Sequence, residues 1–137
     1  MAAIRAGGHI IGNHGYSHRD GFKTGLQEYL DDADRAAQFT SSFLFRPPYG
    51  RLKPLQYIEI RKKYRIFLWD IMPYDFDKTL SPEKSLAILK KKIRPGSLIV
   101  FHDTCHSSAT EILGKFIASA ISEGYGFDIP PEAKQPC

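Results

Sequence analysis

The chain has 137 residues, of which 42% are hydrophobic and 25% charged, a composition typical of one globular domain rather than a low-complexity chain. The net charge is +4, and the basic clusters Arg61-Lys62-Lys63 and Lys90-Lys91-Lys92 fall late in predicted helices, which favours solvated helix ends over a nucleic-acid-binding surface. No apolar run is long enough to span a bilayer, and the first residues lack the apolar core of a signal peptide. The two cysteines, Cys105 and Cys137, do not make a disulfide framework. We therefore expect a cytoplasmic protein with no membrane or nucleic-acid partner.

The first half of the chain alternates short apolar runs with amphipathic stretches of helical length. A capping box at Thr24-Gly25-Leu26-Gln27 predicts a helix start, and an apolar period continues the helix to about residue 37. Phe43-Leu44-Phe45 predicts a short strand, which ends at Pro47-Pro48 because proline cannot continue a ladder. The other expected elements are a short strand or buried turn at 8–12 and a helix at 54–63, opened by Pro54, with Leu55 and Ile58 inward.

The second half continues this alternation, which favours an α/β fold. Ser81-Pro82-Glu83 predicts a helix start with Ser81 as the N-cap, and Leu86, Leu89 and Ile93 then carry the helical period. Ser97–His102 is nearly all apolar, as a strand covered on both faces should be. The remaining expected elements are a strand at 65–70, a helix at 110–122 with Ile112, Leu113, Phe116, Ile117, Ala120 and Ile121 inward, a final strand at 124–129 and a loose tail at 130–137.

His14 and His18 are four residues apart, a spacing at which two side chains on a helical turn share one face. Imidazole is the commonest protein metal ligand, and two imidazoles leave room on a tetrahedral ion for a carboxylate and a water. Taken alone, the pair also fits two surface histidines. A second metal site, built from His102, Asp103, Cys105 and His106, is weighed against a simple helix-entry loop; a thiol hydrolase using Cys105 has less support, since no glycine-rich nucleophile turn surrounds it.

Three predicted strands end in polar residues of the kind that carry chemistry. They are Arg46 to Gly50 after the first strand, Trp69-Asp70 leading to Asp75-Phe76-Asp77 after the second, and His102-Asp103 after the third. In parallel α/β sheets active sites gather at the carboxyl ends of the strands. A charged residue that follows a buried strand needs a partner, so Arg46 and Asp75 are candidates to pair with catalytic groups or with each other.

With these motifs in order, the sequence resembles the polysaccharide deacetylases of the NodB-homology type, carbohydrate esterase family 4. The metal motif of that family, His-[Ser/Thr]-x-x-His, corresponds to His14 to His18, and its Arg-x-Pro-Tyr motif corresponds to Arg46-Pro47-Pro48-Tyr49. Its Asp-Trp motif corresponds to Asp75-Phe76, and its hydrophobic-His-Asp motif to Phe101-His102-Asp103. The resemblance implies a distorted β/α barrel of mostly parallel strands with outer helices.

The resemblance also implies roles for the matched residues. A divalent metal, usually zinc, would be held by His14, His18 and an aspartate, and it would polarise a water and the acetamide carbonyl. His102 would protonate the leaving amine of the sugar, with Asp75 orienting it, while Arg46 would lie against a second aspartate that acts as the base. The backbone N–H beside Tyr49 would stabilise the oxyanion, and the side chains of Tyr49, Trp69 and Phe76 would line an aromatic groove for N-acetylated carbohydrate.

The sequence departs from the family at three places. Gly15 replaces the usual Ser or Thr, and Phe76 replaces the tryptophan, so the groove keeps a ring but loses an N–H donor. The opening Thr-Phe-Asp-Asp-Gly motif, which supplies the metal aspartate and the base, is absent; no Asp or Glu occurs before Asp20. We therefore expect one deacetylase-like domain over 1–137, an incomplete barrel that lacks its first strand-helix-strand unit, whether as a truncated product, a misassigned start or a fragment.

Two function classes follow from these observations. The first is a metal-dependent hydrolase of acetamide groups on carbohydrate, weakly active or inactive because the base and the metal aspartate are missing. The second is a non-catalytic carbohydrate-binding module that uses the remaining aromatic groove. Missing barrel elements would also leave strand edges and apolar faces uncovered, so we expect a homodimer or larger oligomer with residues 1–11 at or near the interface.

Overall fold

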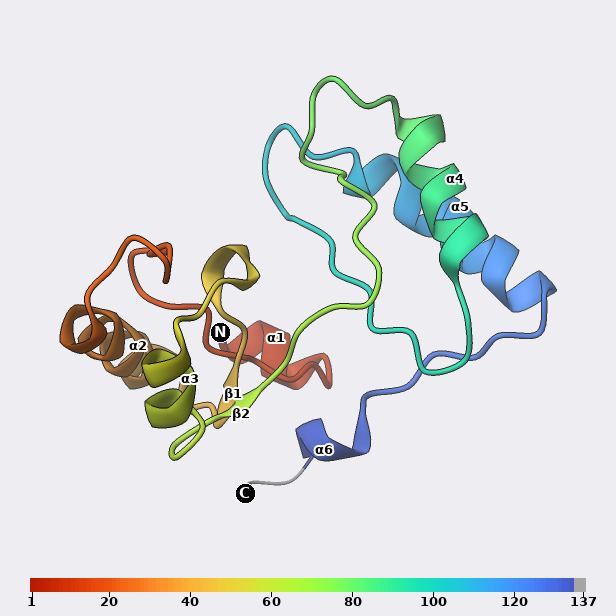
Figure 1. The fold of residues 1–137 in the computed structure, drawn as a ribbon. Coiled ribbons are helices and arrows are strands. Elements are labelled where there is room, and N and C mark those ends of the chain that lie inside the picture. The colour runs from red at the N-terminus through yellow and green to blue at the C-terminus, as the bar shows by residue number, and fades with distance from the viewer. Residues whose placement is uncertain (135–137) are drawn as a thin grey trace. The chain divides into compact units, whose positions relative to one another are not determined.

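A computed structural model describes residues 1–134 (Figure 1). The chain divides into two compact units, one formed by Met1–Leu68 together with the segment from Ile129, and the other by Trp69–Asp128. Each unit has its own cluster of buried apolar side chains. A single domain over residues 1–137, expected from chain length, therefore stays a prediction.

The first unit is built on a short parallel ladder. Strand β1 (Leu44–Phe45) pairs in parallel with β2 (Arg65–Ile66), and Asn13 forms a parallel bridge to Phe45 on the other side of β1. The helices of this unit are α1 (Ala2–Ala6), α2 (Leu26–Thr40), η1 (Pro48–Gly50), α3 (Pro54–Ile60) and α6 (Pro131–Lys134). Tyr29, Ala33, Phe45, Ile60 and Tyr64 form its core. This packing buries one face of α2 against the end of β1.

The predicted helix 54–63 has a different buried face from the one expected. It ends at Ile60, and Leu55 and Ile58 are 63% and 45% exposed, so the prediction that they face inward is wrong. Gln56 is buried instead: its amide nitrogen donates to the carbonyls of Gly21 and Thr24, and its side-chain oxygen accepts from Lys53 N. The buried Gln56 side chain, which hydrogen-bonds to backbone groups, sets the orientation of this short helix. The helical period of apolar residues does not reveal a buried polar residue of this kind.

The start of α2 also differs in detail from the prediction. Its N-cap is Gly25, with no side-chain cap, because the Thr24 hydroxyl donates to Asp20 O instead of capping the helix. The helix runs to Thr40, three residues beyond the predicted end near 37, and ends at Ser41 in the left-handed conformation. Helix α1, which the sequence did not predict, has only five residues, too short to show a period.

The second unit is a pair of helices packed on an irregular ladder. Helix α4 (Pro82–Lys92) begins as predicted, with the Ser81 hydroxyl accepting from Lys84 N. Helix α5 (Ala109–Ser122) packs against it through a core of Ile71, Leu89, Ile112, Phe116 and Ala120. Leu113 and Ile121 are exposed, contrary to the prediction. The basic residues Lys90–Lys92 occupy the last turn of α4, as expected.

The predicted strands are shorter in the structure than in the sequence. Residues 65–70 contribute only β2, and 97–102 contribute a parallel bridge between Ile99 and Ile71. Residues 8–12 and 124–129 form no strand; instead Tyr125 N donates to Ala120 O at the end of α5. A strand forms where a neighbouring segment pairs with its backbone, so an apolar run without such a paired neighbour stays irregular.

The predicted loose tail begins with a helical turn. Residues Pro131–Lys134 form α6, with Ala133 buried, while the remainder of the predicted tail, including Cys137, lies outside the described residues. Over residues 1–134, no helix is long and apolar enough to cross a membrane.

Candidate functional site

The predicted site residues divide between the two units. His14, His18, Arg46 and Tyr49 belong to the first unit, and Trp69, Asp75, Phe76 and His102 belong to the second. The first group follows the parallel ladder of its unit, and Asp75, Phe76 and His102 follow the Ile71–Ile99 bridge, the position expected for strand-end residues, whereas Trp69 precedes that bridge.

Asn13 fixes the start of the histidine loop. Its backbone N–H donates to Leu44 O and its carbonyl accepts from Arg46 N, so the residue before His14 lies in register with β1. Its buried side chain donates to Ala33 O on α2 at 2.8 Å and accepts from Gly15 N at 2.9 Å. His14 therefore begins its loop from a position tied to a strand and a helix.

Asp32 of α2 closes the histidine loop from the other side. Its buried carboxylate accepts hydrogen bonds from Tyr16 N at 2.9 Å and Ser17 N at 3.0 Å, with Arg19 Nε at 3.6 Å. Gly15 has φ +76, and a Cβ placed there would lie 2.9 Å from Asp32 Oδ2. Only glycine fits this approach without strain, so the replacement of Ser or Thr at this position is built into the loop.

The two histidine rings lie next to each other. Their centroids are 5.0 Å apart in an edge-to-face arrangement, and His14 Nδ1 donates to Arg46 O. This bond makes Nε2 the acceptor nitrogen of His14. The His18 ring also lies 4.7 Å from the Tyr49 ring.

His18 and Tyr49 both have a left-handed backbone, with φ of 53° and 56°. Such values are uncommon outside glycine and cost of order 1–3 kcal/mol each when the surrounding structure enforces them. Two strained residues in ring contact are typical of a functional site.

Arg46 is half-buried, and burial lowers the pKa of its guanidinium. Within residues 1–134 its side chain makes no ion pair. A half-buried cation usually has an anionic partner, and the resemblance gives that role to the base aspartate, for which the chain has no matching residue.

The second unit contains a pair of Asp75 and His102. The Asp75 carboxylate is fully buried; Oδ1 accepts from His102 Nδ1 at 3.0 Å, and Oδ2 accepts from the His102 backbone N–H at 2.7 Å. The predicted pairing of these two residues is found in the structure. With Nδ1 donating to the carboxylate, Nε2 is the nitrogen through which His102 can exchange a proton with a substrate.

Ser107 completes this pair and was missed by the sequence interpretation. Its hydroxyl donates to Asp75 Oδ2 at 2.7 Å and accepts from Ala109 N at the start of α5. Desolvation by burial raises the pKa of Asp75, but the hydrogen bonds from His102 and Ser107 and the charge of His102 outweigh burial and lower that pKa. A serine three residues before the predicted helix 110–122 was the available signal, although nothing in the sequence linked it to Asp75.

The predicted aromatic groove residues are all at least partly accessible. The Phe76 ring packs edge-to-face on His102 at 4.5 Å and is 42% exposed, while Trp69 is half-buried. Tyr49 is 57% exposed. Their assignment to substrate binding stays a prediction.

The donor set for a metal is incomplete. Across the part of the chain that the structure describes, no group of three or more His, Cys, Asp or Glu side chains could hold a metal ion. His14 and His18 supply two imidazoles without a carboxylate, which does not make a zinc site with three protein ligands. Asp103, Cys105 and His106 are exposed and form no such group with His102 in residues 1–134, so the alternative metal site at this loop is wrong.

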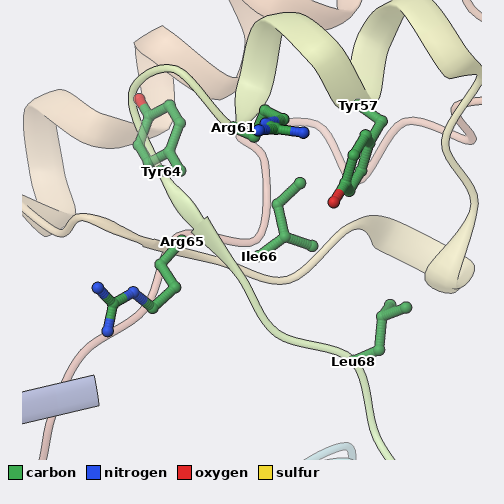
Figure 2. A pocket seen from close by; sticks show the side chains of 6 residues that line it. All are labelled: Tyr57, Arg61, Tyr64, Arg65, Ile66 and Leu68. Carbon is green, nitrogen blue, oxygen red and sulfur yellow. The ribbon is translucent and has the colours of Figure 1, made fainter. Parts of the chain in front are cut away.

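A hollow of about 470 Å³ lies elsewhere in the first unit (Figure 2). It is lined by Tyr57, Arg61, Tyr64, Arg65, Ile66 and Leu68, none of which is a predicted site residue. In Figure 2 the side chains of Tyr57, Ile66 and Leu68 extend toward the same space between α3 and the chain that leaves β2. The hollow is therefore a surface of mixed apolar and basic lining, separate from the histidines.

The fold of this chain is similar to that of solved carbohydrate esterase and deacetylase structures. The solved structure of a peptidoglycan N-acetylglucosamine deacetylase superimposes with a TM-score of 0.84 at 25% identity, over 96% of this chain and 65% of that one. A carbohydrate esterase family 4 pseudoenzyme from Bacillus anthracis superimposes with a TM-score of 0.76 at 25% identity, over 90% of this chain and 45% of that one. A family 4 carbohydrate esterase from Streptomyces lividans, 20% identical, shares the fold with a TM-score of 0.82, over 96% and 71% of the two chains.

Comparison of sequences also finds a deacetylase among the curated relatives. No family model matches the chain. The curated peptidoglycan-N-acetylglucosamine deacetylase of Bacillus cereus is 27% identical over 93% of this chain and 50% of its own length. These likenesses confirm the resemblance read from the motifs and the predicted α/β class: the chain has the NodB-type fold of the carbohydrate esterase family 4 deacetylases, as a partial β/α barrel. It spans about half the length of the curated relative.

Proposed function

We propose that this chain takes part in the hydrolysis of acetamide groups on N-acetylated polysaccharide, with His102 as the proton donor to the leaving amine. The observation that carries the proposal is the buried Asp75–His102 pair, in which three hydrogen bonds hold the carboxylate against the imidazole. Catalytic acids need such a fixed orientation. The relatives named above as deacetylases support the substrate class.

The proposed mechanism assigns each step to a residue of this chain. Asp75 holds His102 with Nδ1 as the donor, so that a protonated His102 delivers the Nε2 proton to the departing sugar nitrogen as the C–N bond breaks. The Tyr49 backbone N–H would stabilise the oxyanion, and its left-handed conformation supports this, because strained backbone at such a site is pre-organised. Zinc would polarise the carbonyl and the water when bound, but the described donors do not complete its site.

Residues 1–137 by themselves are proposed to be weakly active or inactive. No Asp or Glu precedes Asp20, so the chain has no residue matching the base or the metal aspartate, and the loss of general base catalysis alone costs about 10²–10⁴ in rate. Arg46, half-buried and without an ion pair in the described chain, fits the position where the base carboxylate would lie.

The test measures acetate release from chitohexaose, with zinc added, by the wild-type chain and by His102→Ala and His106→Ala. His106 is exposed on the same loop and serves as the matched control. Slow release that is lost in His102→Ala and kept in His106→Ala supports the proposal. Release that is unchanged in His102→Ala contradicts it.

Non-catalytic carbohydrate binding is the second candidate, because Tyr49 and Phe76 expose about half of their rings. Saturable binding of chitohexaose with no acetate release in any variant would favour it. Neither binding nor release would contradict both candidates.

A further inference from the structure

Phe22 lies at the tip of a loop that is unusually well fixed for an exposed segment. Phe22 N donates to Asp20 Oδ1 at 3.0 Å, Lys23 N donates to Asp20 O at 3.0 Å, and the Thr24 hydroxyl donates to the same carbonyl at 2.8 Å. These three bonds close the loop 20–24 on itself. A loop that is already ordered loses little conformational entropy when a ligand binds.

A second set of contacts ties this loop to the chain around α3. The buried Gln56 amide donates to Gly21 O at 3.0 Å and to Thr24 O at 3.1 Å, and Lys53 Nζ donates to Thr24 O at 2.9 Å. A Cβ placed on Gly21 would lie 2.2 Å from Arg51 O, so the two backbones touch. The position of Phe22 beside Arg51 is therefore set by the backbone.

The Phe22 ring is 58% exposed and takes no part in the core. The guanidinium carbon of Arg51 lies 5.8 Å from the Phe22 centroid and 5.8 Å from the Tyr49 centroid, so it bridges the two rings. Tyr49 in turn contacts His18. A row of accessible planar groups thus continues from the histidine pair outward, through Tyr49, Arg51 and Phe22.

The charge of Arg51 is already matched within this row. Its Nη1 lies 2.7 Å from Asp20 Oδ2. A guanidinium paired in this way offers a flat, weakly hydrated surface and further N–H donors, but little net attraction for anions. The row therefore suits a neutral ligand with both apolar ring faces and hydrogen-bond acceptors.

We propose that Phe22, Arg51 and Tyr49 form a binding shelf for a neutral chain of N-acetylated sugars, extending the contact surface beyond the sugar that meets the histidines. The apolar faces of sugar rings pack on the aromatic rings, and acetamide or hydroxyl oxygens accept from the guanidinium. This inference rests on the proposed function for its ligand class, and it adds a contact surface outside the motif residues.

The experiment titrates the full chain with chitohexaose and with the N-acetylglucosamine monomer, using isothermal calorimetry or NMR. Phe22→Ala should weaken hexamer binding by about three- to tenfold and change monomer binding less, because a single aromatic contact contributes that much. Arg51→Lys, which keeps the charge and can keep the ion pair, should weaken hexamer binding too, since lysine has no planar group. Hexamer affinity should change little between low and moderate salt.

The matched control is Tyr57→Ala on α3, where Arg61 lies 5.8 Å from an exposed aromatic ring just as Arg51 does from Phe22. It should leave hexamer affinity unchanged, and backbone NMR spectra establish that each variant is folded. Equal hexamer affinity for Phe22→Ala and wild type would overturn the shelf. A Phe22→Ala effect on sedimentation rather than on sugar binding would overturn it as well and assign the surface to self-association.

The outcome of the chitohexaose titration does not depend on whether the chain is catalytically active. Binding that depends on Phe22 without acetate release in any variant would support the shelf and favour non-catalytic carbohydrate binding over hydrolysis. Acetate release that depends on His102 with no effect of Phe22 would do the reverse.

Discussion

The loop with His14 and His18 and the loop with Asp75 and His102 both present imidazoles after a strand position, but they are supported differently. The first is held through its backbone, by Asn13 and Asp32, and its two imidazoles lack a third ligand in the described residues. The second is held through a side chain, because every hydrogen bond to the Asp75 carboxylate positions His102 or the start of α5. The Asp75–His102 pair thus has all of its hydrogen-bond partners within the described residues, whereas the two imidazoles of the histidine loop have no third metal donor there.

The largest effect should come from Asp75→Asn. The substitution removes a charge that accepts three hydrogen bonds in a fully buried position, so the free energy of unfolding should fall by about 2–4 kcal/mol. Urea denaturation followed by circular dichroism measures it. Asp103→Asn, at an exposed position beside His102, should change stability by less than about 0.5 kcal/mol. Similar stability losses in the two variants would show that the pair is not a stabilising centre.

The same pair predicts a pH dependence with a definite sign. Because the Asp75 pKa is lower in the folded chain than the unfolded value of about 3.9, its contribution is fully present above that value and is lost as pH falls through the folded pKa. The stability difference between wild type and Asp75→Asn should therefore be constant from about pH 7 to 5 and shrink below about pH 4. Denaturation midpoints across this range measure it; a difference that grows on acidification would reverse the assigned sign.

On the other loop, Gly15→Ala should lower stability by about 1–2 kcal/mol, since alanine is disfavoured at φ +76 and its Cβ would press on Asp32 Oδ2. Combining it with Asp32→Ala separates the two causes. The double-mutant cycle should show less additional loss for Gly15→Ala once the carboxylate is gone, leaving only the backbone strain. Strict additivity would mean that Asp32 does not approach this glycine in solution.

The histidine loop should bind zinc only weakly. Two imidazoles without a carboxylate predict a dissociation constant in the micromolar range or above, and His18→Ala should weaken it further. Calorimetry on both proteins tests this. Tight binding that survives His18→Ala would locate the metal elsewhere and remove the histidine loop from the site.

The smallest effect concerns assembly. We predicted a homodimer or larger oligomer with residues 1–11 at or near the interface, and Ile4 and Ile10 are exposed in this segment. Ile4→Lys should then shift the dimer–monomer equilibrium by about tenfold in sedimentation equilibrium, because it places a charge in a small apolar contact. Leu55→Lys, on α3, is the control. A monomeric wild-type chain at high concentration would contradict the prediction.

Two kinds of feature were predictable from the sequence: a helix start marked by its capping residues, and a residue pair marked by a motif. Ser81-Pro82 gave the start of α4, and the motif order gave the Asp75–His102 pair. Contacts between distant residues outside the motifs were not predictable: Asp32 and Ser107 support the two loops from positions 15 and 32 residues away, and no spacing marks them. Leu55 and Ile58 were misassigned because the polar Gln56 turns the short α3 through backbone hydrogen bonds that the apolar period does not include.

One oxygen atom, Asp75 Oδ2, receives both the His102 backbone N–H and the Ser107 hydroxyl, so it closes the chain between them into a ring. The residues inside that ring, 103–106, are all exposed. Substitutions at these four positions should therefore have little effect on the ring. Their number is constrained, because one inserted or deleted residue would move Ser107 away from Asp75 Oδ2 and shift the first turn of α5. This segment should accept a four-residue tag or label by replacement and reject the same tag by insertion.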